Sequence, residues 1–151
     1  MNKFSLQLVL DLVERQAETL AREVKRSHGE WLLARGHQVQ LQVARDRQIH
    51  ALAGELAPGL NAAVLMLRSQ FLQRQQADLQ RAAQRVETCH QAWQARLAQW
   101  MHAHDRVKAL KVLERYHLDA QAVQERRIEQ RQHDELAQNT RFWRRDSEEA
   151  A

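Results

Sequence analysis

The stretch LAGELAPGLNAAVLM, residues 52–66, contains the only proline of the chain, Pro58, followed directly by Gly59. Proline has no N–H to donate and disfavours helix at the residue before it. Glycine readily adopts the positive φ angle that a tight reversal needs. Asn61 is a favoured N-cap residue, so a new helix is expected directly after it. The stretch therefore predicts a turn at residues 57–61 between two helices.

The arm before this turn begins with a heptad pattern. Apolar residues recur there at alternating spacings of four and three, at Leu6, Leu10, Val13, Ala17, Leu20 and Val24. Such spacing is typical of the a and d positions of a coiled coil. The pattern then becomes uneven, and we expect it to pass through Trp31, Leu32, Val39, Ile49, Ala53 and Leu56. Gly29 and Gly36 predict a phase shift between these two parts. A helix is predicted at about 5–56, with Ser5 as its N-cap.

The arm after the turn contains no glycine and no proline. Its heptad repeat is longer, with large apolar residues seven apart at Leu65, Leu72, Leu79, Val86 and Trp93. Ala82, Cys89 and Trp100 fall on the complementary positions. Beyond them the pattern is expected to continue through His104, Val107, Leu110, Leu113 and Leu118. A second helix is predicted at about 62–143, with a frayed tail at 144–151.

Neither helix can bury its apolar stripe alone, and a short turn favours antiparallel neighbours. The predicted fold is all-α: an antiparallel two-helix coiled coil, or long α-helical hairpin, with an overhanging C-terminal helix. The whole chain, 1–151, is expected to form this single elongated domain. Reversal at the turn predicts three neighbouring pairs, which are Leu32 with Val86, Val24 with Trp93, and Leu10 with Lys108.

Charge and composition argue against several classes of function. Charged residues make up 28% of the chain, and the net charge is +4 with acidic and basic residues interspersed. This pattern is typical of a solvated helical surface, and no nucleic-acid-binding motif accompanies it. The apolar part of FSLQLVL at 4–10 is too short for a signal peptide, and acidic residues follow it. With one cysteine, no internal disulfide can form. We expect a cytoplasmic protein.

No catalytic constellation is present in the sequence. No two of the eight histidines lie at the i, i+4 spacing of a metal-binding helix pair. Cys89 falls on a core position without an evident base to activate it. A narrow two-helix protein also offers no concave pocket. We therefore expect no enzyme activity, no cofactor, no metal and no small-molecule substrate.

The two ends of the chain resemble a known family. FSLQLVLDLVERQ at 4–16 is similar to the N-terminal sequence of the FliJ family. Members of this family are coiled-coil components of the bacterial flagellar type III export apparatus. The matching positions there are Phe4, Leu6, Gln7, Leu10, Leu12, Arg15 and Gln16. The stretch at 108–138 resembles the C-terminal part of the family, at Lys108, Leu110, Leu113, Arg115, Arg127, Gln130, Asp134, Glu135, Leu136 and Ala137.

The resemblance implies a non-enzymatic stalk that binds and stimulates the hexameric export ATPase. It also implies links to the cytoplasmic domain of the membrane export gate and to export chaperones. Membrane association would be peripheral and through these partners. Residues expected to contact the ATPase are Arg15, Gln16, Arg127, Gln130 and Arg131. Residues expected to contact the gate or chaperones are Leu65, Leu67 and Phe71.

Two alternatives stay open at this point. The injectisome stalk proteins share the architecture with weaker sequence signals, so the secretion branch is not decided. A structural coiled coil of another assembly would also fit the heptads, and it would self-associate through them. A nucleic-acid-binding helical protein ranks below both of these, since its binding would need a steep salt dependence.

Overall fold

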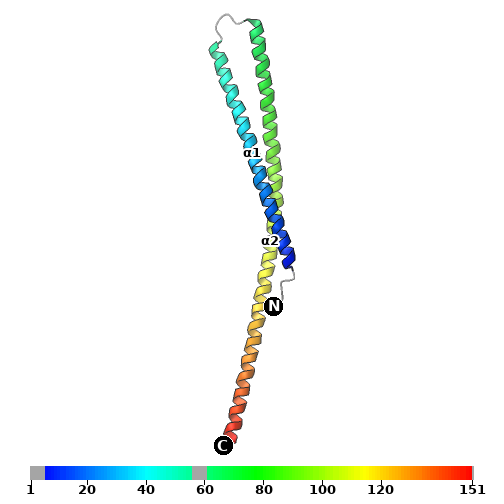
Figure 1. The fold of residues 1–151 in the computed structure, drawn as a ribbon, viewed down its shortest axis with the longest axis vertical. Helices are drawn as coiled ribbons and strands as arrows, with labels where there is room; N and C mark the ends of the chain where they lie inside the picture. The colour runs from blue at the N-terminus through cyan, green and yellow to red at the C-terminus, as the bar shows by residue number, and fades with distance from the viewer. Residues whose placement is uncertain (1–5, 56–60, 151) are drawn as a thin grey trace. The chain divides into compact units, whose positions relative to one another are not determined.

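A computed structural model describes residues 6–55 and 61–150. They form two long helices, α1 at Gln7–Glu55 and α2 at Ala62–Glu149, and these described residues contain no strand (Figure 1). The two helices pack against each other, as in a helical hairpin. The predicted all-α fold is confirmed.

Asn61 caps α2 as predicted. The backbone N–H of Ala63 donates to Asn61 Oδ1 over 3.3 Å, and the N–H of Val64 donates to the Asn61 carbonyl over 3.0 Å. These bonds satisfy donors that a helix start otherwise leaves unpaired. The predicted cap at Ser5, and residues 57–60 of the predicted turn, lie outside the described residues.

The C-terminal end of α2 corrects a prediction. The helix was expected to end near residue 143 and to fray from 144, but it continues to Glu149. No glycine or proline interrupts this segment. The Ser147 hydroxyl also donates to the Trp143 carbonyl over 3.0 Å, a bond made within the helix. Continuation of the helix is therefore consistent with the local sequence.

The described residues divide into two compact units. The hairpin unit consists of residues 14–55 and 61–104, and the terminal unit consists of residues 6–13 and 105–150. The single domain expected from the sequence stays a prediction. Each unit combines a part of α1 with a part of α2.

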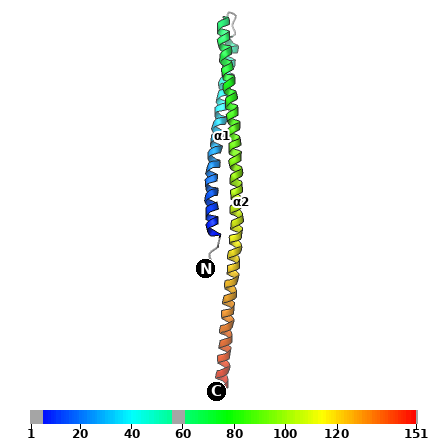
Figure 2. The same cartoon turned by 90° about the vertical axis from the view of Figure 1, so that its right-hand side faces the viewer.

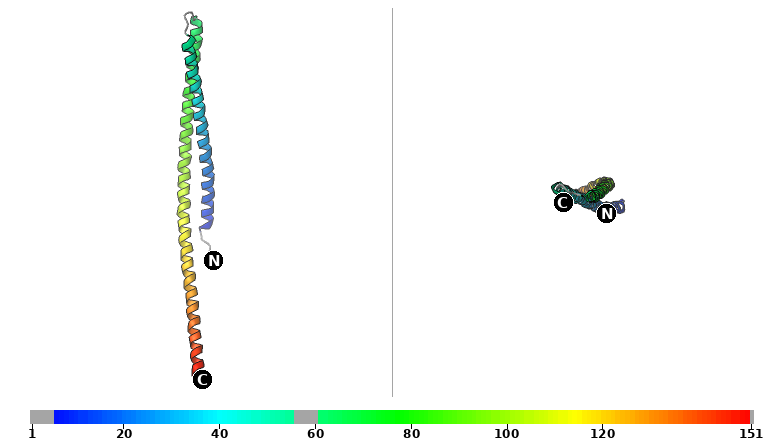
Figure 3. Two further views of the ribbon diagram at one scale, coloured as in Figure 1. Left: turned by 90° about the vertical axis from the view of Figure 1, so that its left-hand side faces the viewer. Right: turned by 90° about the horizontal axis from the view of Figure 1, so that it is seen from above.

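In the hairpin unit, α1 and α2 lie side by side and run in opposite directions (Figures 1 and 2). The further views in Figure 3 show the same antiparallel pair of helices. Residues with reduced exposure recur along both helices at spacings of three and four. On α1 they are Ala17, Leu20, Val24, Ser27, Trp31, Ala34, Gln38, Leu41, Arg45, Gln48 and Leu52. On α2 they are Arg68, Leu72, Gln75, Leu79, Ala82, Val86, Cys89, Trp93, Arg96, Trp100 and Ala103. We call these the core positions.

The core positions of α1 differ from the predicted ones. Leu32, Val39 and Ile49 were expected in the core, but all three are exposed. The core instead follows the heptad phase of the first turns without a shift, and the expected shift at Gly29–Gly36 is wrong. Glycine lowers the stability of a helix but leaves its periodicity unchanged. The phase set by the apolar start of α1 therefore continues, even where polar residues then occupy the core.

The predicted register is close to the observed one. Val24 was expected beside Trp93, and the ion pair between Glu23 and Arg96 lies within two residues of that pairing. The ring of Trp93 reaches further and stacks on Trp31, seven residues beyond Val24 along α1. Leu32, which was paired with Val86, is exposed. Long aromatic side chains can reach diagonal neighbours across a helix pair. The Trp31–Trp93 stack is therefore compatible with the register that the Glu23–Arg96 pair marks.

The core of the hairpin unit is thin. Its buried residues are mostly small, and they are Ser27, Ala34, Leu79 and Ala82. Among the described residues, no large side chain is fully buried. Free energy gained from apolar burial scales with the area removed from water. We therefore expect a modest stability for this unit.

The terminal unit has a short packed part and a long exposed part. Leu10 and Val13 of α1 and Val107 of α2 are buried. Leu113 and Leu118 were expected in the core but are exposed, and Glu114 and His117 have the lower exposure instead. The heptad phase, and not hydrophobicity, again determines which residues are less exposed. From residue 123 to residue 150 every residue is exposed, as expected for an overhanging helix.

Candidate interaction surfaces

An aromatic cluster holds the middle of the hairpin unit together. The rings of Trp31 on α1 and Trp93 on α2 stack with centroids 5.2 Å apart and planes 11° apart. His28 lies 4.8 Å from Trp93, and His90 lies 5.3 Å from Trp31. The guanidinium of Arg35 lies over the Trp31 ring, 5.7 Å from its centroid. All four rings are half-buried, so the cluster is a structural feature with an exposed edge.

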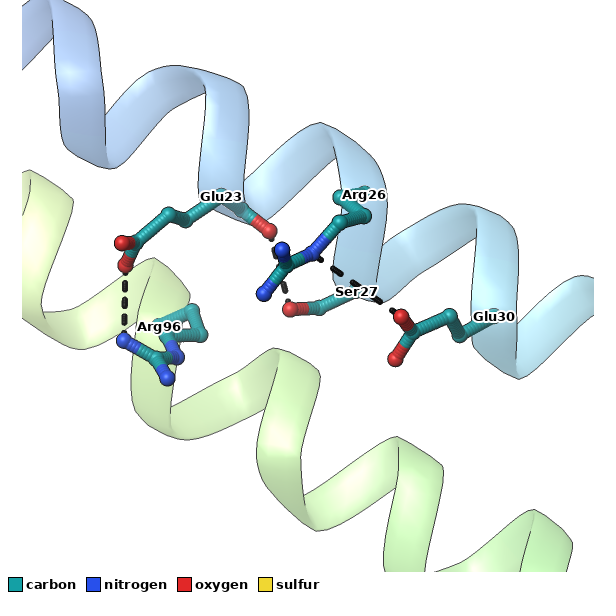
Figure 4. A network of polar contacts seen from close by, with 5 residues as sticks. All are labelled: Glu23, Arg26, Ser27, Glu30 and Arg96. Carbon is teal, nitrogen blue, oxygen red and sulfur yellow. Dashed lines mark hydrogen bonds and ion pairs between the residues drawn. The ribbon is translucent and has the colours of Figure 1, made fainter.

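A polar network lies beside this cluster (Figure 4). Arg96 of α2 donates from Nη1 to Glu23 Oε2 of α1 over 2.6 Å. The hydroxyl of Ser27, a buried core position, donates to the Glu23 carbonyl over 2.8 Å. On the outer side, Arg26 forms an ion pair with Glu30. The Glu23–Arg96 pair links residues far apart in the sequence, and it therefore marks the register of the two helices.

The surface near the start of α2 is strongly apolar. The three predicted gate or chaperone contacts, Leu65, Leu67 and Phe71, are exposed by 46%, 67% and 49%. Met66 is exposed as well. Leu65 was expected at a core position, but Arg68 is the first core residue of α2. The three residues lie within two turns of one helix. We call Leu65, Leu67 and Phe71 the loop-proximal surface.

Two grooves open between α1 and α2 at the loop-proximal surface. One is lined by Gln48, Ala51, Leu52, Val64, Leu67, Arg68 and Phe71. The other is lined by Arg45, Leu52, Leu65, Arg68, Ser69, Leu72, Gln73 and Gln76. Their walls are therefore apolar, with arginine and glutamine side chains among them. A partner could bury apolar side chains here.

Sequence reasoning missed the polar residues at the core beside these grooves. Arg45, Gln48, Arg68 and Gln75 all occupy core positions. Hydrophobicity gives no signal for such residues, since it assigned the core of this segment to Ile49 and Leu65. Continuing the heptad of Leu10–Val24 along α1 without a shift would have found Arg45 and Gln48.

The predicted ATPase contacts lie in two separate units. Arg15 and Gln16 are exposed neighbours on α1 in the hairpin unit. Arg127, Gln130 and Arg131 are exposed on α2 in the terminal unit. The last three are spaced i, i+3 and i+4, so they share one face of the helix.

The end of α2 adds a second basic segment. Phe142 and Trp143 are exposed by 66% and 73%, and Arg141, Arg144 and Arg145 flank them. Exposed aromatic and arginine side chains are typical of energetically important interface residues. This segment belongs to the terminal unit, like Arg127, Gln130 and Arg131.

Across the described ranges, no group of three or more histidine, cysteine or acidic side chains could hold a metal ion. Neither helix, over its described residues, contains a stretch long and apolar enough to cross a bilayer. Cys89 is half-buried at a core position, as predicted. The geometry thus offers surfaces for partners: the loop-proximal surface and the exposed part of α2.

A family model of known proteins matches most of the chain. The family model described as "Flagellar FliJ protein" matches residues 2–147 of the 151-residue chain. No curated protein and no solved structure matches. The matched range includes the N-terminal and C-terminal stretches at 4–16 and 108–138, and also the middle of the chain between them.

Proposed function

Because the chain belongs to the FliJ family, components of the flagellar type III export apparatus, we propose that it binds the hexameric export ATPase and raises its rate of ATP hydrolysis. The observation that carries this proposal is the family match over residues 2–147. The protein acts in the cytoplasm without catalysing a reaction itself. It reaches the inner membrane only through its partners.

The proposed ATPase contact is made by Arg15, Gln16, Arg127, Gln130 and Arg131. All five are exposed, and the three arginines carry charge that a carboxylate-lined surface would attract. Long-range attraction between exposed charges is screened by salt. We therefore expect the stimulation of the ATPase to weaken as the salt concentration rises.

The proposed contact with the export gate or with export chaperones is the loop-proximal surface. Leu65, Leu67 and Phe71 expose apolar area beside two grooves, and apolar area of this kind is a common feature of protein interaction sites. This surface belongs to the hairpin unit, whereas Arg127, Gln130 and Arg131 belong to the terminal unit. The loop-proximal surface and these three ATPase-contact residues therefore lie in different units, while Arg15 and Gln16 lie in the hairpin unit.

An ATPase assay tests the proposal. Phosphate release by the purified flagellar export ATPase is measured with and without the full chain, and the injectisome ATPase of the same cell serves as a second arm. We expect stimulation of the flagellar enzyme. The double variant Arg127→Glu/Arg131→Glu should lose at least about half of the stimulation, because it reverses two contact charges.

The matched control is Arg22→Glu/Arg47→Glu, which reverses two exposed arginines of α1 outside the proposed contact. It should keep the stimulation of the unchanged chain. If the unchanged chain fails to stimulate the flagellar enzyme, the proposed regulation is wrong. If both double variants lose the same share of stimulation, the assignment of the contact residues is wrong.

A further inference from the structure

The core of the hairpin unit becomes polar beside the two grooves. Arg45 and Gln48 of α1 and Gln75 of α2 occupy core positions there. Arg45 Nε, Gln48 Oε1 and Gln75 Oε1 are buried atoms without a hydrogen-bond partner among the described residues. Leaving a buried donor or acceptor unpaired costs free energy. The sequence therefore keeps polar groups at positions where leucine would give a more stable hairpin.

These polar groups adjoin exposed apolar side chains. Gln48 lines one groove together with Leu67 and Phe71, and Arg45 lines the other together with Leu65. Arg68 lines both grooves. A molecule that enters them would meet apolar area and arginine side chains together.

The charge of this segment identifies the chemistry of the occupant. Residues 41–54 and 61–76 contain four arginines, which are Arg45, Arg47, Arg68 and Arg74. Their one acidic residue is Asp46, which already accepts a hydrogen bond from Gln42. A second copy of this chain would bring the same positive charges against these, and like charges facing each other oppose association. An acidic partner is favoured instead.

We propose that the two grooves and the polar core between them are a docking site for an acidic amphipathic helix of a partner protein. The groove between two antiparallel helices accepts a third helix, whose apolar side chains pack against Leu65, Leu67 and Phe71. Its carboxylates pair with the guanidinium of Arg45 and with Arg68. Arg45 and Gln48 line the grooves, and Arg45 Nε and Gln48 Oε1 gain hydrogen-bond partners in the complex.

The inference deepens the proposed gate or chaperone contact, and it rests on the use of the loop-proximal surface for docking. It specifies the partner as an acidic helix. Its test needs no export protein, so a failure here leaves ATPase stimulation untouched. A failure of ATPase stimulation likewise leaves this binding measurement interpretable.

The probe is a labelled synthetic helix of about 18 residues, long enough for about five turns, with leucines on one face and glutamates on the other. Fluorescence anisotropy with the full chain measures its dissociation constant at about 50 mM salt. Two matched peptides carry glutamine or lysine in place of every glutamate. We expect the glutamine peptide to bind at least about fivefold more weakly, and the lysine peptide to bind more weakly still.

Substitutions in the chain test which residues form the docking site. Arg45→Gln and Phe71→Ala should each weaken binding of the glutamate peptide at least about fivefold. The control Arg22→Gln, which removes an exposed charge elsewhere on α1, should leave binding unchanged. The double variant Arg45→Leu/Gln48→Leu should raise the melting temperature by about 4 °C or more and still weaken binding. That variant folds at least as well as the parent, so poor folding would not explain its loss of binding.

Three results would overturn the proposal. The first is equal affinity for the glutamate and glutamine peptides, or no binding of the glutamate peptide. The second is unchanged binding in Arg45→Leu/Gln48→Leu. The third is self-association of the chain that the glutamate peptide disrupts and that Arg45→Leu strengthens, because the grooves would then belong to a second copy.

Discussion

Trp31 and Trp93 show how single residues stabilise a thin core. Most buried core positions of the hairpin unit hold small side chains, such as Ala34 and Ala82. The two indole rings supply large apolar area at opposing positions, and they stack with centroids 5.2 Å apart. Stacked aromatic pairs contribute beyond the area that they bury. The stability of this unit should therefore depend strongly on these two residues.

Trp31→Ala should lower the free energy of unfolding by about 1–3 kcal/mol, less than for a fully buried tryptophan because Trp31 is half-buried. Urea denaturation followed by circular dichroism measures the change. Trp143→Ala is the matched control, since Trp143 is 73% exposed. That control should change the free energy by less than about 0.5 kcal/mol. Equal losses in both variants would contradict the role assigned to the stack.

Replacing Gly36 by alanine is expected to raise the stability of the protein. A Cβ atom added to Gly36 would meet nothing within 4 Å, and the residue lies inside α1. Alanine is favoured over glycine in a helix interior by about 0.5–1 kcal/mol, so Gly36→Ala should raise the free energy of unfolding by about that amount. Thermal unfolding followed by circular dichroism measures it. The reverse change at an exposed site, Ala44→Gly, should cost a similar amount.

If Gly36→Ala lowered the stability instead, the result would contradict the open space described around this position.

The elements were predictable from the sequence to different degrees. The helix α2 was predicted well around Leu79–Trp93, because large apolar residues and the heptad phase agree there. The helix α1 was predicted poorly beyond Val24. There the heptad phase places Gln38, Arg45 and Gln48 in the core, while Val39 and Ile49 lie one residue away and are exposed. Hydrophobicity and phase disagree, and the phase prevails because α1 is one uninterrupted helix.

The sequence predicted candidate contact residues that are exposed in the structure, but it did not predict the grooves. Leu67, Phe71, Arg127 and Arg131 are exposed, as a contact residue must be. The polar core at Arg45 and the grooves beside it had no such signal. They arise from pairing of two helix faces, which a residue-by-residue reading of hydrophobicity does not contain.

The ion pair of Glu23 with Arg96 tests the register of the two helices. Both side chains are more than 30% exposed, so the pair should contribute only about 0.5–1 kcal/mol. Glu23→Arg and Arg96→Glu should each destabilise the hairpin unit. The double variant restores opposite charges and should recover most of the loss. A double-mutant cycle from urea denaturation measures this coupling free energy.

A distant arginine of the same unit provides the control. Glu23→Arg combined with a charge reversal at Arg74, which is exposed on α2 and 22 residues before Arg96, should show no coupling. If the cycle for Glu23 and Arg96 also gave zero, the register would differ from the one described. A coupling that vanishes at high salt would instead agree with a partly exposed pair.

In the molecule as a whole, packed residues stabilise the fold and exposed residues are available for binding. The core positions of the hairpin unit support the fold, while residues 123–149 of α2 are exposed throughout. In proteins most of the stability of a helix comes from tertiary packing, which this segment lacks. Arg127, Gln130, Arg131 and the aromatic residues at 142–143 lie in this segment. A contact surface on such a helix can order when a partner binds.

Hydrogen exchange tests this division. In the free chain, amides at 123–149 should exchange at least about 100-fold faster than amides at 79–100, because no side chain of the exposed segment is buried. Adding the export ATPase should slow exchange around 127–131 and leave 79–100 unchanged. The chain carrying Arg127→Glu/Arg131→Glu is the control, and its exposed segment should stay unprotected in the presence of the ATPase. Equal protection of both segments in the free chain would contradict the exposure described, since a second copy would then have to cover α2 beyond residue 123.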